Sequence, residues 1–119
     1  MSSFLTGLLE SIGLRKRQRP RVGLRPHRTV SVPLGVDAAY ERVLDAFARV
    51  LGANIYVDDR STHMIEAGFG LVNAERLRVS LESQGATQTT VHIEAFYPAG
   101  TERPPNSRSV DALADALSQ

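Results

Sequence analysis

The sequence contains no cysteine, and it also lacks the short motifs that mark most enzyme sites. Without thiols the chain can form no disulfide, no thiolate metal site and no cysteine nucleophile. Its histidines, His27, His63 and His92, lack the i, i+4 spacing by which a helix presents two ligands to one metal ion. The Gly-Phe-Gly at 68–70 is too short for a dinucleotide loop, and no nucleophile elbow or phosphate loop occurs. We therefore expect no metal, no cofactor and no enzymatic activity.

Long apolar runs are missing as well. Residues 1–14 read as one short amphipathic helix whose apolar face carries Phe4, Leu5, Leu8, Leu9 and Ile12. Twelve residues of helix rise only about 18 Å, and a membrane span needs roughly 20 apolar residues. We expect this helix not to cross a bilayer. The basic residues follow the apolar ones, unlike in a secretory signal, whereas a mitochondrial transit peptide remains an alternative.

Negative charge is scarce at the start of the chain. Residues 1–28 hold seven of the fourteen cations and one of the thirteen acids, a balance of +6, and residues 29–119 carry −5. Residues 15–28 contain two prolines and no acid, which predicts a basic flexible linker. Five of its cations fall within seven residues: Arg15, Lys16, Arg17, Arg19 and Arg21. The chain is thus a mildly acidic body with a strongly basic arm.

Residues 29–119 are long enough for a single α+β domain with one core. Residues 29–34 alternate apolar and polar side chains, which predicts a half-buried strand. The next segment, 36–52, has apolar residues at helical spacing, and we expect Asp37 to cap this helix and Gly52 to end it. Its apolar stripe consists of Tyr40, Val43, Leu44, Phe47, Val50 and Leu51.

Four further strands and a final helix are predicted after residue 52. The strands lie near 53–58, 62–70, 74–83 and 88–97, and short connections make them an antiparallel meander. Ser109 is the expected cap of the last helix, whose apolar stripe is Val110, Leu113, Ala114 and Leu117. The residues expected to face inward are Ile55, Val57, Ile65, Ala67, Phe69, Leu77, Val79, Leu81, Val91, Ile93 and Ala95.

One-faced strands and one-striped helices imply two layers. We expect a curved, antiparallel, five-stranded sheet with two helices on one face, in the order β-α-β-β-β-β-α, preceded by the amphipathic helix and the basic linker. Over residues 29–118 this order resembles that of TATA-binding-protein-like domains and of small bacterial domains of unknown function, and less closely a truncated helix-grip lipid-binding fold. The resemblance concerns the order of elements, so it implies a fold and transfers no functional residue.

Arg76, Arg78, His92 and Glu94 are predicted to share the outward face of the sheet. Cross-strand ion pairs commonly solvate such a face, and a binding patch is the alternative. A sheet that grips nucleic acid stacks bases on outward aromatic rings, and Tyr56 is the one candidate found at an outward position.

The basic arm is the strongest functional signal. An apolar helix face that inserts, followed by cations that bind headgroups, predicts a non-enzymatic adaptor attached peripherally to an anionic membrane, cytoplasmic and at the inner membrane face. The same cations could instead bind a nucleic acid or an acidic partner. The arm could also pack on its own domain or on a second copy, as in a homodimer. A last alternative is a small apolar ligand held in a void lined by Phe69, Phe96 and Leu113.

Overall fold

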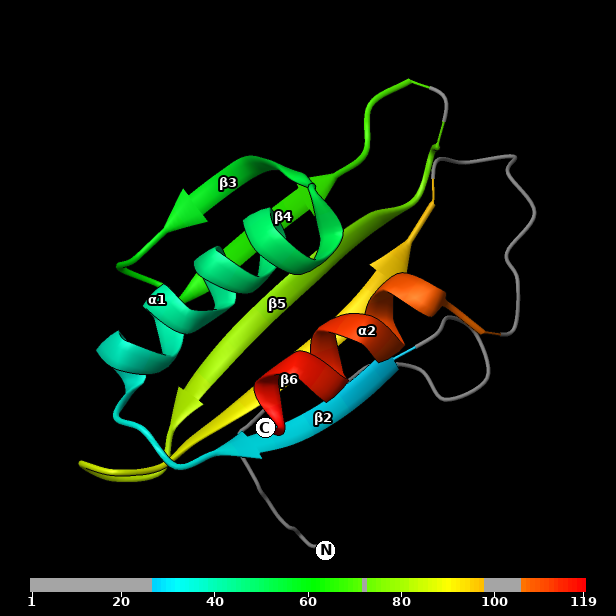
Figure 1. The fold of residues 1–119 in the computed structure, drawn as a ribbon. Coiled ribbons are helices and arrows are strands. Elements are labelled where there is room, and N and C mark those ends of the chain that lie inside the picture. The colour runs from blue at the N-terminus through cyan, green and yellow to red at the C-terminus, as the bar shows by residue number, and fades with distance from the viewer. Residues whose placement is uncertain (1–26, 72, 98–105) are drawn as a thin grey trace, which may run out of the picture.

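The computed structural model of the protein describes residues 27–71, 73–97 and 106–119. Along the chain its elements are β2 (His27–Val32), α1 (Val36–Ala46), η1 (Phe47–Leu51), β3 (Asn54–Asp59), β4 (Met64–Gly68), β5 (Arg76–Ser83), β6 (Thr89–Phe96) and α2 (Arg108–Leu117) (Figure 1). The predicted order β-α-β-β-β-β-α is therefore confirmed. The helix predicted over residues 1–14 lies outside the described residues.

The five strands form one antiparallel sheet in the order β2-β6-β5-β4-β3. Strands β3 to β6 are the predicted meander, and β2, the first described strand, lies beside β6, the last. Apolar residues pair across the ladder, with Val30 opposite Val91 and Val79 opposite Ile93. Strands far apart in sequence are thereby joined at the centre of the domain.

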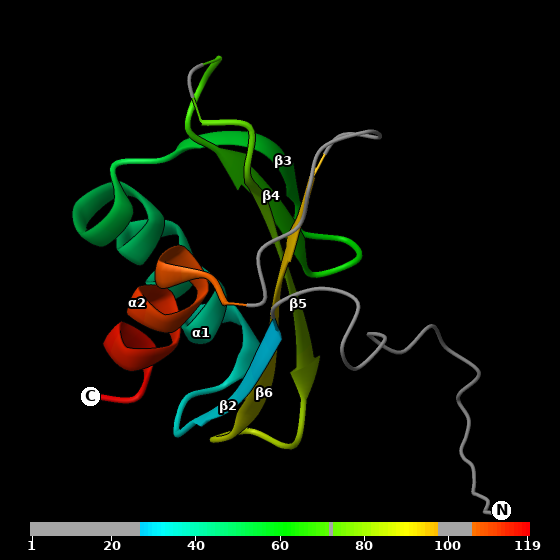
Figure 2. The same ribbon diagram turned by 90° about the vertical axis from the view of Figure 1, so that its right-hand side faces the viewer.

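Both helices cover the same face of the sheet, and Figure 2 shows the two layers edge on. Burying a large apolar side chain between such layers contributes about 1.5–3 kcal/mol. The core draws on both helices, on η1 and on every strand of the sheet except β3. Its largest fully buried side chains are Tyr40, Phe47, Ile65, Leu77, Ile93, Leu113 and Leu117. Neither of these helices, nor η1, lies over the opposite face of the sheet, which is called the outer face below.

Helix α1 and the π-helical turn η1 together span the segment predicted as one helix. Gly52 ends it in the left-handed conformation, with φ at 61°, as the sequence predicts. The expected cap at Asp37 is wrong, because Gly35 occupies the N-cap position and makes no side-chain cap hydrogen bond. Asp37 lies instead in the first turn, where its charge is favourable to the helix dipole.

The second helix begins earlier than predicted. Its N-cap is Ser107, whose hydroxyl accepts a hydrogen bond from the Val110 N–H at 3.2 Å. The prediction of Ser109 as the cap is wrong, since Ser109 lies inside the first turn. Both serines precede the same apolar stripe, so the sequence pattern alone does not distinguish them.

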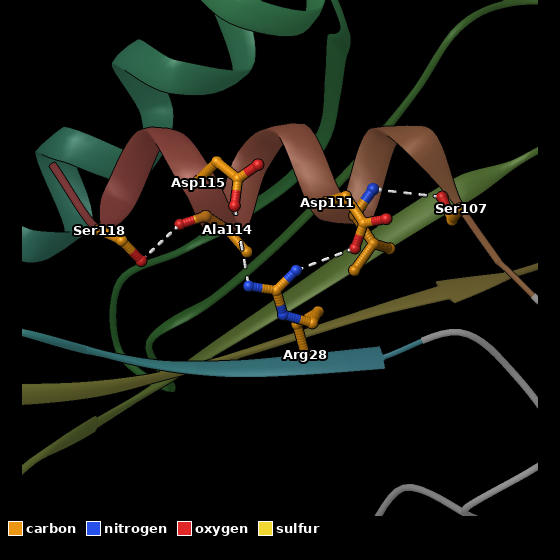
Figure 3. Close-up of polar contacts among 7 residues, drawn as sticks. Arg28, Ser107, Asp111, Ala114, Asp115 and Ser118 are labelled. Carbon is orange, nitrogen blue, oxygen red and sulfur yellow. Dashed lines mark hydrogen bonds and ion pairs between the residues drawn. The ribbon is translucent and has the colours of Figure 1, made fainter.

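Strand β2 begins at His27, two residues before the expected start of the domain. Arg28 is therefore part of the sheet, and its guanidinium contacts two carboxylates of α2 (Figure 3). It donates to Asp111 Oδ1 at 2.9 Å and lies 3.8 Å from Asp115 Oδ1. The last cation of the basic segment thus joins β2 to α2.

Strand β3 departs from simple alternation. Its register against β4 shifts between Ile55, which pairs with Ala67, and Val57, which pairs with Glu66. This β-bulge places Val57 on the outer face with Glu66, so the prediction that Val57 points inward is wrong. Ile55 does pair with an inward residue, yet it is 39% exposed because β3 is an edge strand.

Candidate functional site

The outer face is the candidate site, because side chains of four neighbouring strands meet there and no helix of the described residues covers them. The strand register places all four residues of the predicted sheet-face patch on it: Arg76, Arg78, His92 and Glu94. Residues directly opposite each other in a ladder share a face. Arg76 is opposite Phe96 and also opposite Gly68, and Arg78 is opposite Glu94 and Glu66.

Tyr56 lies on the outer face at the position of the β3 bulge. Its ring covers Gly68 so closely that a Cβ atom on Gly68 would lie 2.6 Å from the ring carbon Cε2. The guanidinium carbon of Arg76 lies 4.6 Å from the centre of the same ring, within the range of a cation–π interaction. The missing side chain at position 68 allows the ring to rest against the sheet.

Phe96 completes a group of side chains that we call the arginine–aromatic patch: Tyr56, Arg76 and Phe96. Phe96 is on the outer face because it follows His92 and Glu94 in the two-residue alternation of β6. The guanidinium carbon of Arg78 lies 4.9 Å from the Phe96 ring centre. The same alternation is visible in the sequence, from which Phe96 is instead predicted to line an apolar void.

The apolar-ligand void predicted between Phe69, Phe96 and Leu113 is wrong in this form. Leu113 is fully buried on the helix side of the sheet, whereas Phe96 is on the outer face. Phe69 follows the last residue of β4 and is half-buried. These three side chains cannot line one cavity because the sheet separates two of them.

The two arginines of the outer face differ in their ionic partners. Arg78 Nε lies 2.8 Å from Glu66 Oε2, and Arg78 Nη1 lies 4.0 Å from Glu94 Oε2. Arg76 makes no ion pair with any residue of the part that the structure describes. The charge of Arg78 is therefore compensated by neighbours, and the exposed charge of Arg76 is not.

His92 lies in the part of the outer face farther from the patch. Its Nδ1 is 3.2 Å from the Thr29 hydroxyl, and its Nε2 is 3.3 Å from Glu82 Oε1. These contacts join β2, β6 and β5 across the sheet. They are polar contacts of the kind that solvates an open sheet face.

A second polar cluster joins the start of β5, the end of β6 and α2. The Glu75 carboxylate, only 8% exposed, accepts at Oε2 from the Tyr97 hydroxyl at 2.6 Å and from the Ser107 hydroxyl at 2.7 Å. Burial, and then the hydrogen bond to Glu75, raises the pKa of Tyr97 above its usual value. Ser107 also caps α2, so this cluster fixes the helix on the sheet.

A third cluster surrounds the only fully buried tyrosine of the described residues. The Tyr40 hydroxyl donates to Asp58 Oδ1 at 2.6 Å, and Arg60 lies over the ring and pairs with Glu41. Burial first, and then the bond to Asp58, raises the pKa of Tyr40. A tyrosine whose pKa is raised in this way is a poor general acid at neutral pH.

The turn after β3 is held by Asp59. Its Oδ1 accepts from the backbone N–H groups of Ser61 and Thr62 and from the Ser61 hydroxyl. The hydrogen bonds from Ser61 and Thr62 lower the pKa of Asp59. His63 follows with φ at 56°. The carboxylate and hydroxyl of this turn bond to each other and to the local backbone, which is the geometry of an Asx turn.

The predicted membrane- or polyanion-binding residues, Phe4 through Arg21, lie outside the described residues. Within residues 27–71, 73–97 and 106–119, no helix is both long and apolar enough to span a bilayer. The same residues contain no cluster of three or more carboxylate or histidine side chains placed to hold a metal ion.

Comparison with protein-family models and with curated proteins gives no match to this chain. The class of protein is therefore defined by the fold alone, as an α+β domain in which two helices cover one face of a five-stranded antiparallel sheet.

Proposed function

We propose that the protein is a non-enzymatic adaptor that attaches to an anionic membrane surface through residues 4–21 and offers the outer face of its sheet to a partner. The observation that carries membrane attachment is the order of apolar and basic residues in the arm. An apolar stripe at 4–12 is followed directly by five cations within 15–21. On this proposal the protein is cytoplasmic and acts at the inner face of the membrane.

Two weak signals combine in this mode of attachment. Each cation close to an anionic surface contributes about 1 kcal/mol, and an inserted apolar face adds the free energy of its burial. Either signal alone gives marginal, reversible binding. The body of residues 29–119 has a net charge of −5 and would be repelled by the same surface. The arm, rather than the body, is therefore the part expected to touch the membrane.

A second candidate is nucleic-acid binding through the same arm. Neutralising phosphates with the cations of residues 15–28 releases counterions, whichever polyanion carries the phosphates. Phe96 and Tyr56, on either side of Arg76, give the outer face two aromatic rings, the groups on which bases stack. The apolar stripe distinguishes the candidates, because a nucleic acid gains little from Leu8 and Leu9.

The test is co-sedimentation of the full chain with vesicles of phosphatidylserine and phosphatidylcholine, and with phosphatidylcholine vesicles alone. The key variant is Leu8→Glu with Leu9→Glu. Its matched control is Leu71→Glu, which makes the same exchange at a fully exposed leucine of the body. We expect the full chain and the control to bind the anionic vesicles, with affinity falling as salt rises, and the double variant to remain in solution.

Failure of the full chain to sediment with anionic vesicles would overturn membrane attachment. Equal binding by the double variant would point to charge alone. A mobility-shift assay with duplex and single-stranded DNA would then decide whether the arm binds nucleic acid.

A further inference from the structure

We infer that the arginine–aromatic patch, Tyr56, Arg76 and Phe96, is a docking surface for an acidic segment of a partner protein. This segment would carry an aspartate or glutamate next to an apolar side chain. The inference rests on the proposed function only in that an adaptor has a partner, and it stands or falls independently of the membrane. It specifies the place of docking and the chemistry of the occupant.

Two features of the backbone lie beside the ring of Tyr56. Alternation from the inward Ile55 turns Tyr56 to the outer face, and the β-bulge between Ile55 and Val57 places Val57 on that face as well. Gly68 leaves the space that the ring occupies, because a Cβ there would collide with it at 2.6 Å. Bulges frequently occur where a sheet re-aims a side chain for a functional site. An aromatic ring that is merely exposed on a sheet needs neither a bulge in its strand nor a glycine beneath it.

Arg76 supplies the charge that the occupant must match. It is exposed, it lies 4.6 Å from the Tyr56 ring centre, and no carboxylate of the described residues pairs with it. The neighbouring Arg78 has Glu66 at 2.8 Å and is already compensated. A guanidinium held against an aromatic ring keeps its fork of N–H donors available for one carboxylate.

The remaining charges of the outer face argue against a nucleic acid. Among the described residues, the face carries Glu66, Glu82 and Glu94 besides the two arginines, Arg76 and Arg78. Binding of a single strand requires a continuous positive groove along its phosphates, and here the glutamates interrupt it. One uncompensated cation beside two rings fits one carboxylate with an apolar neighbour.

The shape of the surface argues against a small molecule. Small ligands are held in concave sites that bury most of their surface, whereas the three side chains of this patch are spread over β3, β5 and β6 on one face of the sheet. Protein interfaces are enriched in tyrosine, phenylalanine and arginine, the residue types that supply most hot spots. Tyr56, 46% exposed, offers apolar area that binding would remove from water.

The experiment uses a phage library of random 12-residue peptides, selected on the immobilised full chain. Selected peptides are synthesised and their binding is measured by fluorescence anisotropy. We expect them to share an acidic residue next to an apolar one. We expect Arg76→Glu to weaken their binding at least tenfold, as loss of a charge-assisted hydrogen bond does, and Tyr56→Ala to weaken it as well.

The control variant is Arg49→Glu, the same charge reversal at a 79% exposed arginine on η1. It should leave peptide binding unchanged within twofold. Circular dichroism of each variant establishes that the fold persists.

Three outcomes would overturn the inference: no selected peptide, peptides whose binding is unaffected by Arg76→Glu, or peptides without an acidic residue. Binding of a thymidine 20-mer that Arg76→Glu abolishes, with no peptide bound, would assign the patch to nucleic acid instead. A concentration-dependent dimer dissociated by Arg76→Glu would assign it to a second copy. None of these results depends on the vesicle assay, so the two proposals fail separately.

Discussion

Among the described residues, Glu75 is the one buried carboxylate. A buried carboxylate is tolerated because two hydroxyls donate to the same oxygen atom. The two donors are Tyr97, the residue after β6, and Ser107, the N-cap of α2, which lie ten positions apart in the sequence. One side chain thereby connects three parts of the fold.

Replacing this carboxylate tests its structural role. Glu75→Ala leaves the hydroxyls of Tyr97 and Ser107 without their acceptor, so we expect the free energy of unfolding to fall by about 1–3 kcal/mol. Asp45→Ala is the control, because it removes an exposed pair with Arg49, which contributes less than about 1 kcal/mol. Urea unfolding followed by circular dichroism measures both. Equal losses would contradict the role of Glu75.

The hydrogen-bonded hydroxyls of Tyr40 and Tyr97 predict a dependence of stability on alkaline pH. The pKa values of Tyr40 and Tyr97 are raised above about 10, the value for an unfolded chain. Below that pH both states hold the protons and stability is at its full value. Above it the unfolded chain loses protons first, so the free energy of unfolding should decline as pH rises from about 10.

The measurement is urea unfolding of the native chain at pH values from 8 to 11.5, beside Tyr40→Phe with Tyr97→Phe. The chain has a single lysine among its fourteen cations, so few other groups titrate in this range. The double variant should be less stable at pH 8 but show a flatter decline. An equally steep decline would show that these tyrosines are not its cause.

Among the elements, the two helices begin in different ways. Helix α1 starts at Gly35 without a side-chain cap, and α2 starts at Ser107 with one. The cap of α2 also donates to Glu75, so its hydroxyl is used as donor and as acceptor. The start of α2 is therefore set by contacts outside the helix.

A pair of serine substitutions tests this assignment. Ser107→Ala removes the cap and one donor to Glu75, and we expect a loss of about 1–2 kcal/mol of unfolding free energy. Ser109→Ala, two residues later and inside the helix, should change stability by less than about 0.5 kcal/mol. Thermal or urea unfolding of both variants measures the two losses of unfolding free energy. The reverse order of effects would restore Ser109 as the cap.

At the scale of the whole molecule, the arm of residues 1–28 and the body of residues 29–119 carry net charges of opposite sign, +6 and −5. Among the described residues, all the core residues lie between Val30 and Leu117, and the pair of Arg28 with Asp111 of α2 is the first ion pair along the chain. If the arm serves attachment rather than folding, its removal should leave the body intact.

Truncation tests this separation. A chain beginning at His27 keeps β2 and Arg28, so its melting temperature should lie within about 2 °C of that of the full chain. It should lose all binding to anionic vesicles. A drop of 10 °C or more would mean that the arm packs on the body, which was one alternative drawn from the sequence.

The sequence by itself determined the class and order of the elements. Period-2 alternation in Val79 and Ile93, and helical spacing in Tyr40, Val43 and Phe47, specify which faces are apolar, and apolar faces must be buried together. The left-handed end at Gly52 followed from glycine's lack of a side chain. The position of β2 beside β6 was not predicted, because strand order depends on which edge the crossing helix reaches.

Only the tertiary structure brought the three residues of the arginine–aromatic patch together. A bulge is a property of two paired strands, so the outward turn of Val57 and the placement of Tyr56 against Gly68 cannot be read from β3 alone. The cap at Ser107 and the burial of Glu75 likewise depend on partners 32 residues apart. Local pattern specifies the faces of single elements, whereas contacts between distant segments specify which of their side chains meet.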